Sequence, residues 1–146
     1  MEEQLKVSRE GPDRINALND LAWDLRVHDV IRATSLAELA LKLSRNLDAE
    51  GNPYPQGIAQ AQVTLGRLAI SSGSYGLALT RLIEAYEFLQ DLPSPVLLGE
   101  ACHAIGWAHN SLGNYEESLN FLNKALDIFR DLENRQKEAD ILTSLV

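Results

Sequence analysis

Several features that mark other protein classes are missing from this sequence. Its 146 residues include one cysteine, Cys102, which excludes an internal disulfide and any metal site built from several thiolates. No uninterrupted apolar run approaches the roughly 20 residues that a membrane-spanning helix needs. The acidic, polar start of the chain differs from a secretory signal peptide, which combines a basic segment with an apolar core. These absences favour a cytoplasmic protein.

Positive charge is also scarce. Lysine and arginine total 13 against 21 aspartate and glutamate residues, so the net charge is −8. Binding to a phosphate backbone or to an anionic membrane surface depends on basic patches. The charge balance therefore argues against nucleic-acid and membrane partners, and we expect most of the acidic surplus to lie on a solvated outer face.

Motifs that carry catalysis are missing as well. The chain has no glycine-rich phosphate loop, no nucleophile elbow and no zinc-protease helix motif. Cys102 and His103 are sequence neighbours, so on a helix their side chains diverge by about 100° and cannot pair as nucleophile and base. His103 and His109 fall on different helical faces. We expect no enzymatic activity, cofactor or metal site in this chain, whatever larger protein it belongs to.

What the sequence does contain is an internal repeat with a period of 40 residues. When the chain is shifted by 40 positions, Gly66 aligns with Gly106 and Tyr75 with Tyr115, among many other matches. The first 50 residues carry a degenerate copy, in which the turn between the two helices is expected to be one residue shorter. The array therefore holds about three and a half copies.

Each copy has the pattern of two helices joined by a short turn. Apolar residues recur at helical spacing, turn-forming residues interrupt them at 72–74, and a second apolar stripe follows from Tyr75. No segment shows the sustained alternation of a β-strand. The sequence therefore predicts an all-α fold of antiparallel helix hairpins.

The repeat boundaries divide the chain into five segments. Pro53 and Pro55 stop the helix that precedes the second copy. The predicted segments are an N-terminal tail (1–11), a degenerate first repeat (12–52), a linker with the second repeat (53–95), a third repeat (96–134) and the first helix of a truncated fourth repeat (135–146).

The end of the chain suggests a further expectation. Natural arrays end on a helix with a polar outer face, whereas the last segment carries the apolar residues Ile141, Leu142, Leu145 and Val146. We therefore expect the chain to be a fragment of a longer protein. An unpaired helix of this kind leaves an apolar patch, which could support a homodimer through the exposed C-terminal helix.

Small residues recur where helices are expected to approach closely. Gly66 and Gly106, with Ala22 in the first copy, lie where the two helices of a hairpin should be nearest. A glycine inside a helix costs about 1 kcal/mol in propensity, so packing must offset it. Ala78 and Ala85 lie on one face of the second helix and let it nest against its neighbours.

The third copy carries a resemblance to a known family. Ile-Gly at 105–106, Leu-Gly-Asn-Tyr-Glu-Glu-Ser-Leu at 112–119 and Lys-Ala-Leu at 124–126 together resemble a tetratricopeptide repeat. Ile105 and Ser118 depart from the usual leucine and alanine. The period exceeds the common length of about 34 residues and is similar to the extended repeats of kinesin light chains and bacterial regulators. Residues 17–26 resemble the opening repeat of sensory arrays that precede bacterial diguanylate cyclases and histidine kinases.

The resemblance implies a right-handed α-solenoid whose concave face is lined by the first helix of each pair and binds a protein or peptide. The residues expected on this face lie opposite the packing stripe of each first helix. They are Asn19, Trp23, Arg26, Val63, Arg67, Glu100, His103, Trp107 and Asn110, with Asn16, Gln60 and Ile70 beside them.

Two interpretations of the tryptophans stay open. Trp23 and Trp107 occupy the same repeat position, where they either pack against the neighbouring hairpin or, with Arg67 between them, anchor a partner. Tryptophan and arginine are among the residues that dominate interface energetics. The clamp with which this family grips a C-terminal carboxylate is not reproduced, because tryptophan stands where that clamp needs small polar groups. A receptor for chaperone tails is therefore disfavoured.

The sequence thus predicts a non-enzymatic interaction module, the sensory or docking part of a larger bacterial signalling regulator. The alternative is a dimerisation or scaffold segment of a multidomain signalling enzyme, a diguanylate cyclase or a kinase. Replacement of Trp23 and Trp107 separates the two hypotheses, because only the first requires the concave face for partner capture.

Overall fold

The computed structural model describes residues 11–47 and 50–145. Over these residues it contains seven helices and no strand, which confirms the predicted all-α fold. None of these helices is both long enough and apolar enough to cross a bilayer. The helices are α2 (Pro12–Leu25), α3 (Val30–Arg45), α4 (Pro55–Ser71), α5 (Tyr75–Leu89), α6 (Pro95–Ser111), α7 (Tyr115–Asp131) and α8 (Arg135–Ser144).

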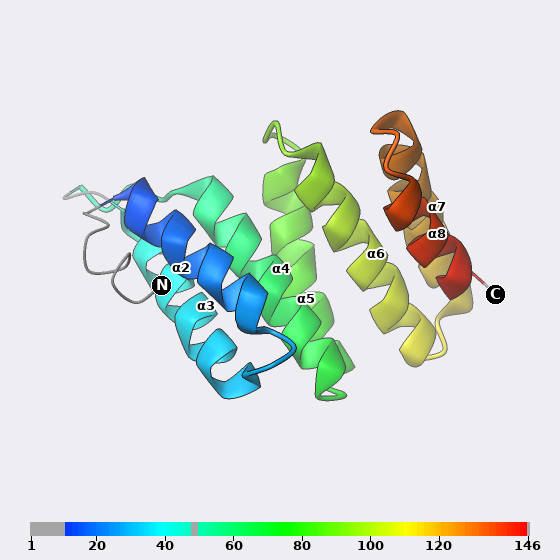
Figure 1. The fold of residues 1–146 in the computed structure, drawn as a ribbon, viewed down its shortest axis with the longest axis horizontal. Coiled ribbons are helices and arrows are strands. Elements are labelled where there is room, and N and C mark those ends of the chain that lie inside the picture. The colour runs from blue at the N-terminus through cyan, green and yellow to red at the C-terminus, as the bar shows by residue number, and fades with distance from the viewer. Residues whose placement is uncertain (1–10, 48–49, 146) are drawn as a thin grey trace.

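The helices form two layers along the chain (Figure 1). The pairs α2/α3, α4/α5 and α6/α7 make the most extensive contacts, and each second helix also packs against the first helix of the next pair. Neighbouring first helices touch, α2 with α4 and α4 with α6, whereas no comparable contact joins α3 to α5 or α5 to α7. The hairpins therefore stack as an α-solenoid with its first helices on the inner side, as predicted.

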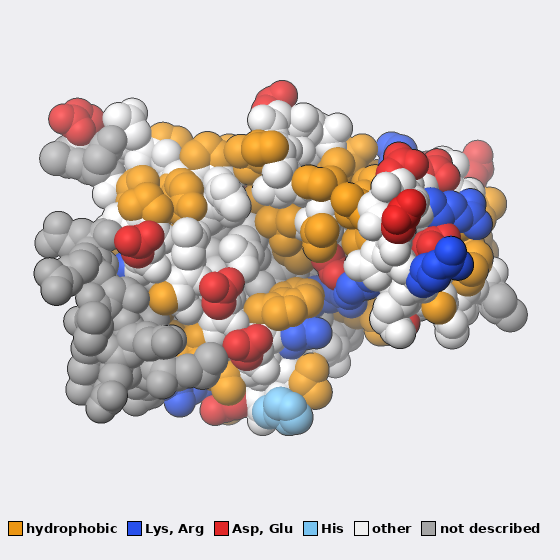
Figure 2. All heavy atoms as spheres, turned by 45° about the horizontal axis from the view of Figure 1, so that its top comes forward, with side chains coloured by type: hydrophobic (Ala, Val, Ile, Leu, Met, Phe, Trp, Pro, Cys, Tyr) orange, Lys and Arg blue, Asp and Glu red, His pale blue; other side chains and the backbone are white. Residues whose placement is uncertain are grey.

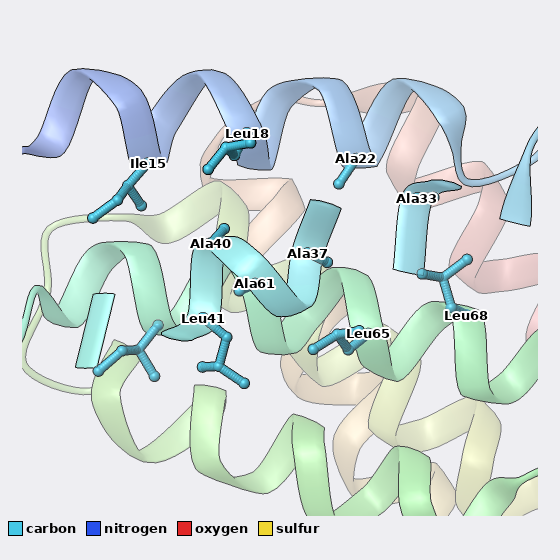
Figure 3. Packing of buried hydrophobic residues seen from close by; sticks show 11 residues of the cluster. Ile15, Leu18, Ala22, Ala33, Ala37, Ala40, Leu41, Ala61, Leu65 and Leu68 are labelled. Carbon is cyan, nitrogen blue, oxygen red and sulfur yellow. The ribbon is translucent and has the colours of Figure 1, made fainter. Parts of the chain in front are cut away.

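The core runs along the solenoid as a series of clusters. In the first cluster, side chains of α2, α3 and α4 meet, with Ile15 and Leu18 directed from α2 toward the two other helices (Figure 3). Ala33, Ala37 and Ala40 of α3 are completely buried there, and their small side chains let the helices approach. Each leucine or isoleucine buried in this way contributes about 1.5–3 kcal/mol relative to exposure.

Three of the turns that join successive helices have the same form. In the turns after α4, α6 and α7, one residue has a positive φ, and the backbone N–H of the next residue donates to the carbonyl five residues before it. Glycine holds the positive-φ position twice and glutamate once, so the third turn carries no glycine signal in the sequence. These residues are Gly73 (φ 80°), Gly113 (φ 83°) and Glu133 (φ 55°).

The expectation of a shorter turn in the first copy is wrong. The first copy is one residue shorter because its first helix is shorter. α2 ends at Leu25, whereas the end of α4 at Ser71 corresponds to position 27 of the first copy. Four residues then connect α2 to α3, against three between α4 and α5. This connection has no glycine, and it ends where the carboxylate of Asp29 accepts a hydrogen bond from the backbone N–H of Arg32 and caps α3.

The small residues lie where the helices come closest, as predicted. A Cβ atom on Gly66 would overlap the side chain of Leu82 in α5, and one on Gly106 would lie 2.7 Å from Cγ of Leu122 in α7. The same holds for a glycine outside this expectation, because a Cβ on Gly99 would lie 2.6 Å from the ring of Phe129. Leucine or phenylalanine therefore fills the space that each glycine leaves.

The last helix is more covered than the sequence suggests. Ile141 is completely buried and Leu145 packs against the same cluster, which includes Phe129 and Leu126 of α7. Leu142 is the only described large apolar residue of this helix that remains substantially exposed, and Val146 lies outside the described residues. The expected apolar patch on α8 is thus smaller than predicted, because α8 turns its apolar side chains toward α7.

We expect Gly66→Ala to destabilise the protein by about 1–2 kcal/mol. The added methyl group overlaps Leu82, and overpacking of about 1–3 kcal/mol outweighs the gain of up to about 1 kcal/mol in helix propensity. Urea unfolding measures the difference. Gly76→Ala is the matched control, since a Cβ there meets open space and should raise stability by about 0.5 kcal/mol. Equal effects at the two sites would contradict the close-approach argument.

Candidate binding groove

The inner layer carries two neighbouring hollows. The first hollow, of about 480 Å³, lies between α2, α4 and the start of α6, and its lining includes Trp23, Gln60, Val63, Pro95, Leu97 and Glu100. The second hollow, of about 560 Å³, lies between the ends of α2, α4 and α6, and its lining includes Arg26, Val30, Arg67, Ile70, Tyr75 and Trp107. We call the two hollows together the groove.

Figure 2 looks onto this face, where hydrophobic side chains gather around a hollow in which basic and acidic side chains meet. Most of the lining in both hollows is apolar. Such a surface, apolar with a few convergent polar groups, is typical of a binding site.

A buried carboxylate joins three of the inner helices. Glu100 of α6 is only 6% exposed, and it accepts from Nη2 of Arg67 in α4 at 2.7 Å and from Nζ of Lys137 in α8 at 2.5 Å. Burial raises the pKa of Glu100, but the hydrogen bond from Lys137 and the charge of Arg67 outweigh it, so the pKa falls below its ordinary value. Loss of either cation would leave a buried charge with one partner fewer.

Trp23 serves both packing and the groove. Its ring is half-buried against a cluster that contains Val63 and Leu89, and it also lines the first hollow. The guanidinium carbon of Arg26 lies 3.7 Å from the ring centroid, and that of Arg67 lies 6.0 Å from it. Nη1 of Arg26 donates to the backbone carbonyl of Trp23 at 2.7 Å, which holds this guanidinium in place. The packing interpretation and the groove interpretation are thus compatible at this position.

Trp107 is placed differently from Trp23. It is 46% exposed and borders the second hollow. Its ring stacks on His103, with 6.4 Å between centroids, and Nε2 of His103 lies 3.2 Å from Oγ of Ser144 in α8. A half-exposed tryptophan supported by a buried neighbour presents a large apolar area in a defined orientation.

The structure brings six of the nine predicted residues together around the groove. They are Trp23, Arg26, Val63, Arg67, Glu100 and Trp107. Val63 and Glu100 belong to its floor, because they are only 0% and 6% exposed.

Three predicted residues do not present a side chain to the groove. Asn19 is completely buried where α2 crosses α4, and its Nδ2 donates to the carbonyl of Gly57 at 3.2 Å. His103 is only 6% exposed and lines neither hollow, although its ring stacks on Trp107. Asn110 is exposed but lines neither hollow. Helical spacing within one helix takes no account of the neighbouring helices. In the stack these neighbours cover the flanks of the inward face of an inner helix.

Of the three residues expected beside these nine, two line the groove and one does not. Oδ1 of Asn16 accepts from the hydroxyl of Tyr54 at 3.1 Å, away from both hollows. Gln60 lines the first hollow and donates to Asp20 at 3.2 Å, while Ile70 lines the second hollow.

Several groove residues escaped the sequence argument. Val27, Val30 and Tyr75 line the second hollow and come from a turn and from the starts of second helices, where no inward residues were predicted. Lys137 lines neither hollow but pairs with Glu100 from α8, for which no inward residue was predicted either. A usable signal existed at Val27 and Val30, because both are apolar and flank a polar turn, and both are exposed in the structure.

The single cysteine is structural. Cys102 is buried against Leu122 and Phe129, and burial raises the pKa of its thiol to about 11. The thiol is therefore protonated at neutral pH and is a poor nucleophile. Among residues 11–47 and 50–145, no group of three or more histidine, cysteine, aspartate or glutamate side chains is arranged to hold a metal ion.

We expect stability to fall as the pH is lowered below about 6.5, through His103. Burial, with the charge of Arg67, lowers the pKa of His103 to about 4, while an unfolded histidine titrates near about 6.5. Between these values the unfolded chain binds a proton that the folded chain excludes, so acid favours unfolding. The loss should reach about 2 kcal/mol between about pH 6.5 and pH 4.5.

Urea unfolding across this pH range tests the expectation. His103→Gln should flatten the profile, and His28→Gln, in an exposed turn, should preserve it. The lowered pKa of Glu100 contributes stability that is lost only as the pH falls below about 4.3, the ordinary value of a glutamate, outside this range. An unchanged slope in His103→Gln would show that another group carries the pH dependence.

Comparison with known proteins agrees with this architecture. The sequence model of the tetratricopeptide repeat family matches residues 57–131, which run from α4 to the end of α7. No curated protein and no solved structure matches the chain. The match covers more than half of the 146 residues and includes all but the first two residues of the hairpins α4/α5 and α6/α7. The chain therefore belongs to the tetratricopeptide repeat family.

Proposed function

We propose that this chain is an interaction module that binds a peptide segment of a partner protein in its groove. Repeats of this family generally mediate protein–protein interactions and are generally not catalytic. The observation that carries the proposal is the half-exposed ring of Trp107, which borders the second of two neighbouring hollows in the inner layer. Tryptophan and arginine in such a setting are the residues that most often dominate binding energy.

The groove is also preorganised. Glu100 ties α4, α6 and α8 together through Arg67 and Lys137, and the ring of Trp23 is held between its own core cluster and Arg26. Side chains that are already ordered lose little conformational entropy when a ligand binds. This supports recognition by preformed helices rather than by folding on binding.

The proposal extends to the cellular context. We place the module in the cytoplasm, as the sensory or docking part of a larger bacterial signalling regulator. The support is the similarity of residues 17–26 to the opening repeat of such arrays. Partner binding would act on the output by changing the curvature of the solenoid, since α2, α4 and α6 all border the groove.

Peptides selected from a random twelve-residue display library should bind the groove. Each of the two tryptophans gives its own indole N–H signal in an NMR spectrum, and we expect the chemical shifts of both signals to change on binding. Trp107→Ala should weaken the selected peptides at least tenfold, by loss of a central contact, with little change in melting temperature because the ring is half-exposed.

Tyr115→Ala is the matched control, because Tyr115 is an exposed aromatic residue that lines neither hollow. If a peptide changes only the NMR signals of residues in α3 and α5, the binding surface lies on the outer layer. Failure to enrich any peptide would count against a groove for linear segments.

A second candidate function is self-association. Tyr75 and Leu79 of α5 pack against α6 of the next hairpin. Their equivalents 40 residues later, Tyr115 and Leu119 of α7, are 69% and 50% exposed. Leu112 and Leu142 are exposed on neighbouring helices. We propose that this apolar stripe, together with α8, supports a homodimer, as a dimerisation or scaffold segment of a signalling enzyme would require.

Sedimentation velocity over a concentration series tests self-association. If the stripe is a dimer surface, the weight-average sedimentation coefficient should rise with concentration, and Leu119→Ser should weaken the association at least tenfold. Leu77→Ser, which removes an equally exposed leucine from α5, should leave it unchanged. A monomer at all concentrations would contradict this second function without affecting the groove.

A further inference from the structure

We propose that the second hollow binds an acidic side chain located inside the partner peptide, with apolar residues on both sides of it. This inference rests on the proposed function and names the class of segment that the groove accepts. It depends on the distribution of charge along the groove, which differs sharply between the two hollows.

Among the residues that the structure describes, the second hollow is lined by two arginines and no carboxylate. Arg26 and Arg67 both border it, and the other lining residues are uncharged. The first hollow has the opposite character, because its single charged lining residue is Glu100. In a chain with a net charge of −8, the second hollow is therefore a localised positive site.

The two arginines have unused hydrogen-bonding capacity. Arg67 pairs with Glu100 through Nη2, but its buried Nε has no hydrogen-bond partner among the described residues. Arg26 donates to the carbonyl of Trp23 and has no carboxylate within 4 Å among the residues that the structure describes. Each guanidinium carries five N–H donors, so several remain for a ligand.

The arrangement of like charges also favours an anion. Burial lowers the pKa of Arg26, and the nearby charge of Arg67 lowers it further, whereas the charges of Glu100 and Asp24 act in the opposite direction. A carboxylate bound between Arg26 and Arg67 would reduce the repulsion between these two cations and form charge-assisted hydrogen bonds.

The position of the hollow indicates a side chain rather than a chain end. Apolar residues line both hollows, Leu97 in the first and Val27 and Trp107 in the second, which also contains the arginines. A peptide that ended at the arginines would leave one of these surfaces uncovered. Glu100 would repel a second acidic residue from the first hollow, which sets the register of the bound segment.

An array of blocked nonapeptides tests the inference. Every peptide is acetylated and amidated, its flanking residues are drawn from leucine, valine, alanine and serine, and its central residue is glutamate, glutamine or lysine. We expect the protein to be retained at least tenfold more on glutamate than on glutamine peptides, and least on lysine peptides. Raising the salt concentration should reduce this preference.

Arg26→Gln is the decisive variant, because Arg26 makes no described ion pair whose loss would unfold the protein. We expect it to remove most of the glutamate preference. Arg14→Gln changes the same charge at an exposed position of α2 outside both hollows and should preserve the preference.

The outcomes separate this inference from the proposed function. Equal retention on glutamate and glutamine peptides, lost in Trp107→Ala, would keep the groove and overturn the acidic specificity. A glutamate preference that survives Arg26→Gln would overturn the assignment to the second hollow. Binding to a second, matched array with unblocked C-termini but not to the blocked array would show capture of a terminal carboxylate and overturn the internal site. No retention on any array would overturn both proposals.

Discussion

The close approach of paired helices is the constraint on which the rest of the structure depends. At Gly66 and Gly106 the inner helix has no side chain, and a leucine of the outer helix occupies the space. This contact sets the spacing within each hairpin, and fully buried alanines such as Ala78 and Ala85 set it between hairpins. A regular stack follows, with first helices in one layer, and this layer creates the groove.

Polar interactions hold the inner layer across repeats. Glu100 contacts cations from the helices before and after it, so a single buried carboxylate connects three successive units. On the opposite side of the stack, Glu84 of α5 accepts two hydrogen bonds from Arg45 of α3 and one from Gln62 of α4. Such pairs contribute little net stability. Their role here is to orient the helices on which the groove residues stand.

The groove combines charge and apolar surface in a way that no single helix could. Its positive part requires Arg26 from α2 and Arg67 from α4, its negative part comes from α6, and Trp107 borders the second hollow from the end of α6. Because the charged and aromatic groups come from three helices, small changes in stacking would alter the distances between them. Binding in the groove, as proposed above, would therefore be coupled to the curvature of the solenoid.

The sequence by itself determined the fold, because a 40-residue period and helical spacing of apolar residues are local signals that survive without knowledge of neighbours. It also located the close contacts at Gly66 and Gly106. Tertiary structure alone decided which inward residues are accessible, since Asn19 and Val63 share the helical face of Trp23 and Arg67 but are covered by adjacent helices. It also brought Lys137 to Glu100, a contact between helices that no periodicity within one helix encodes.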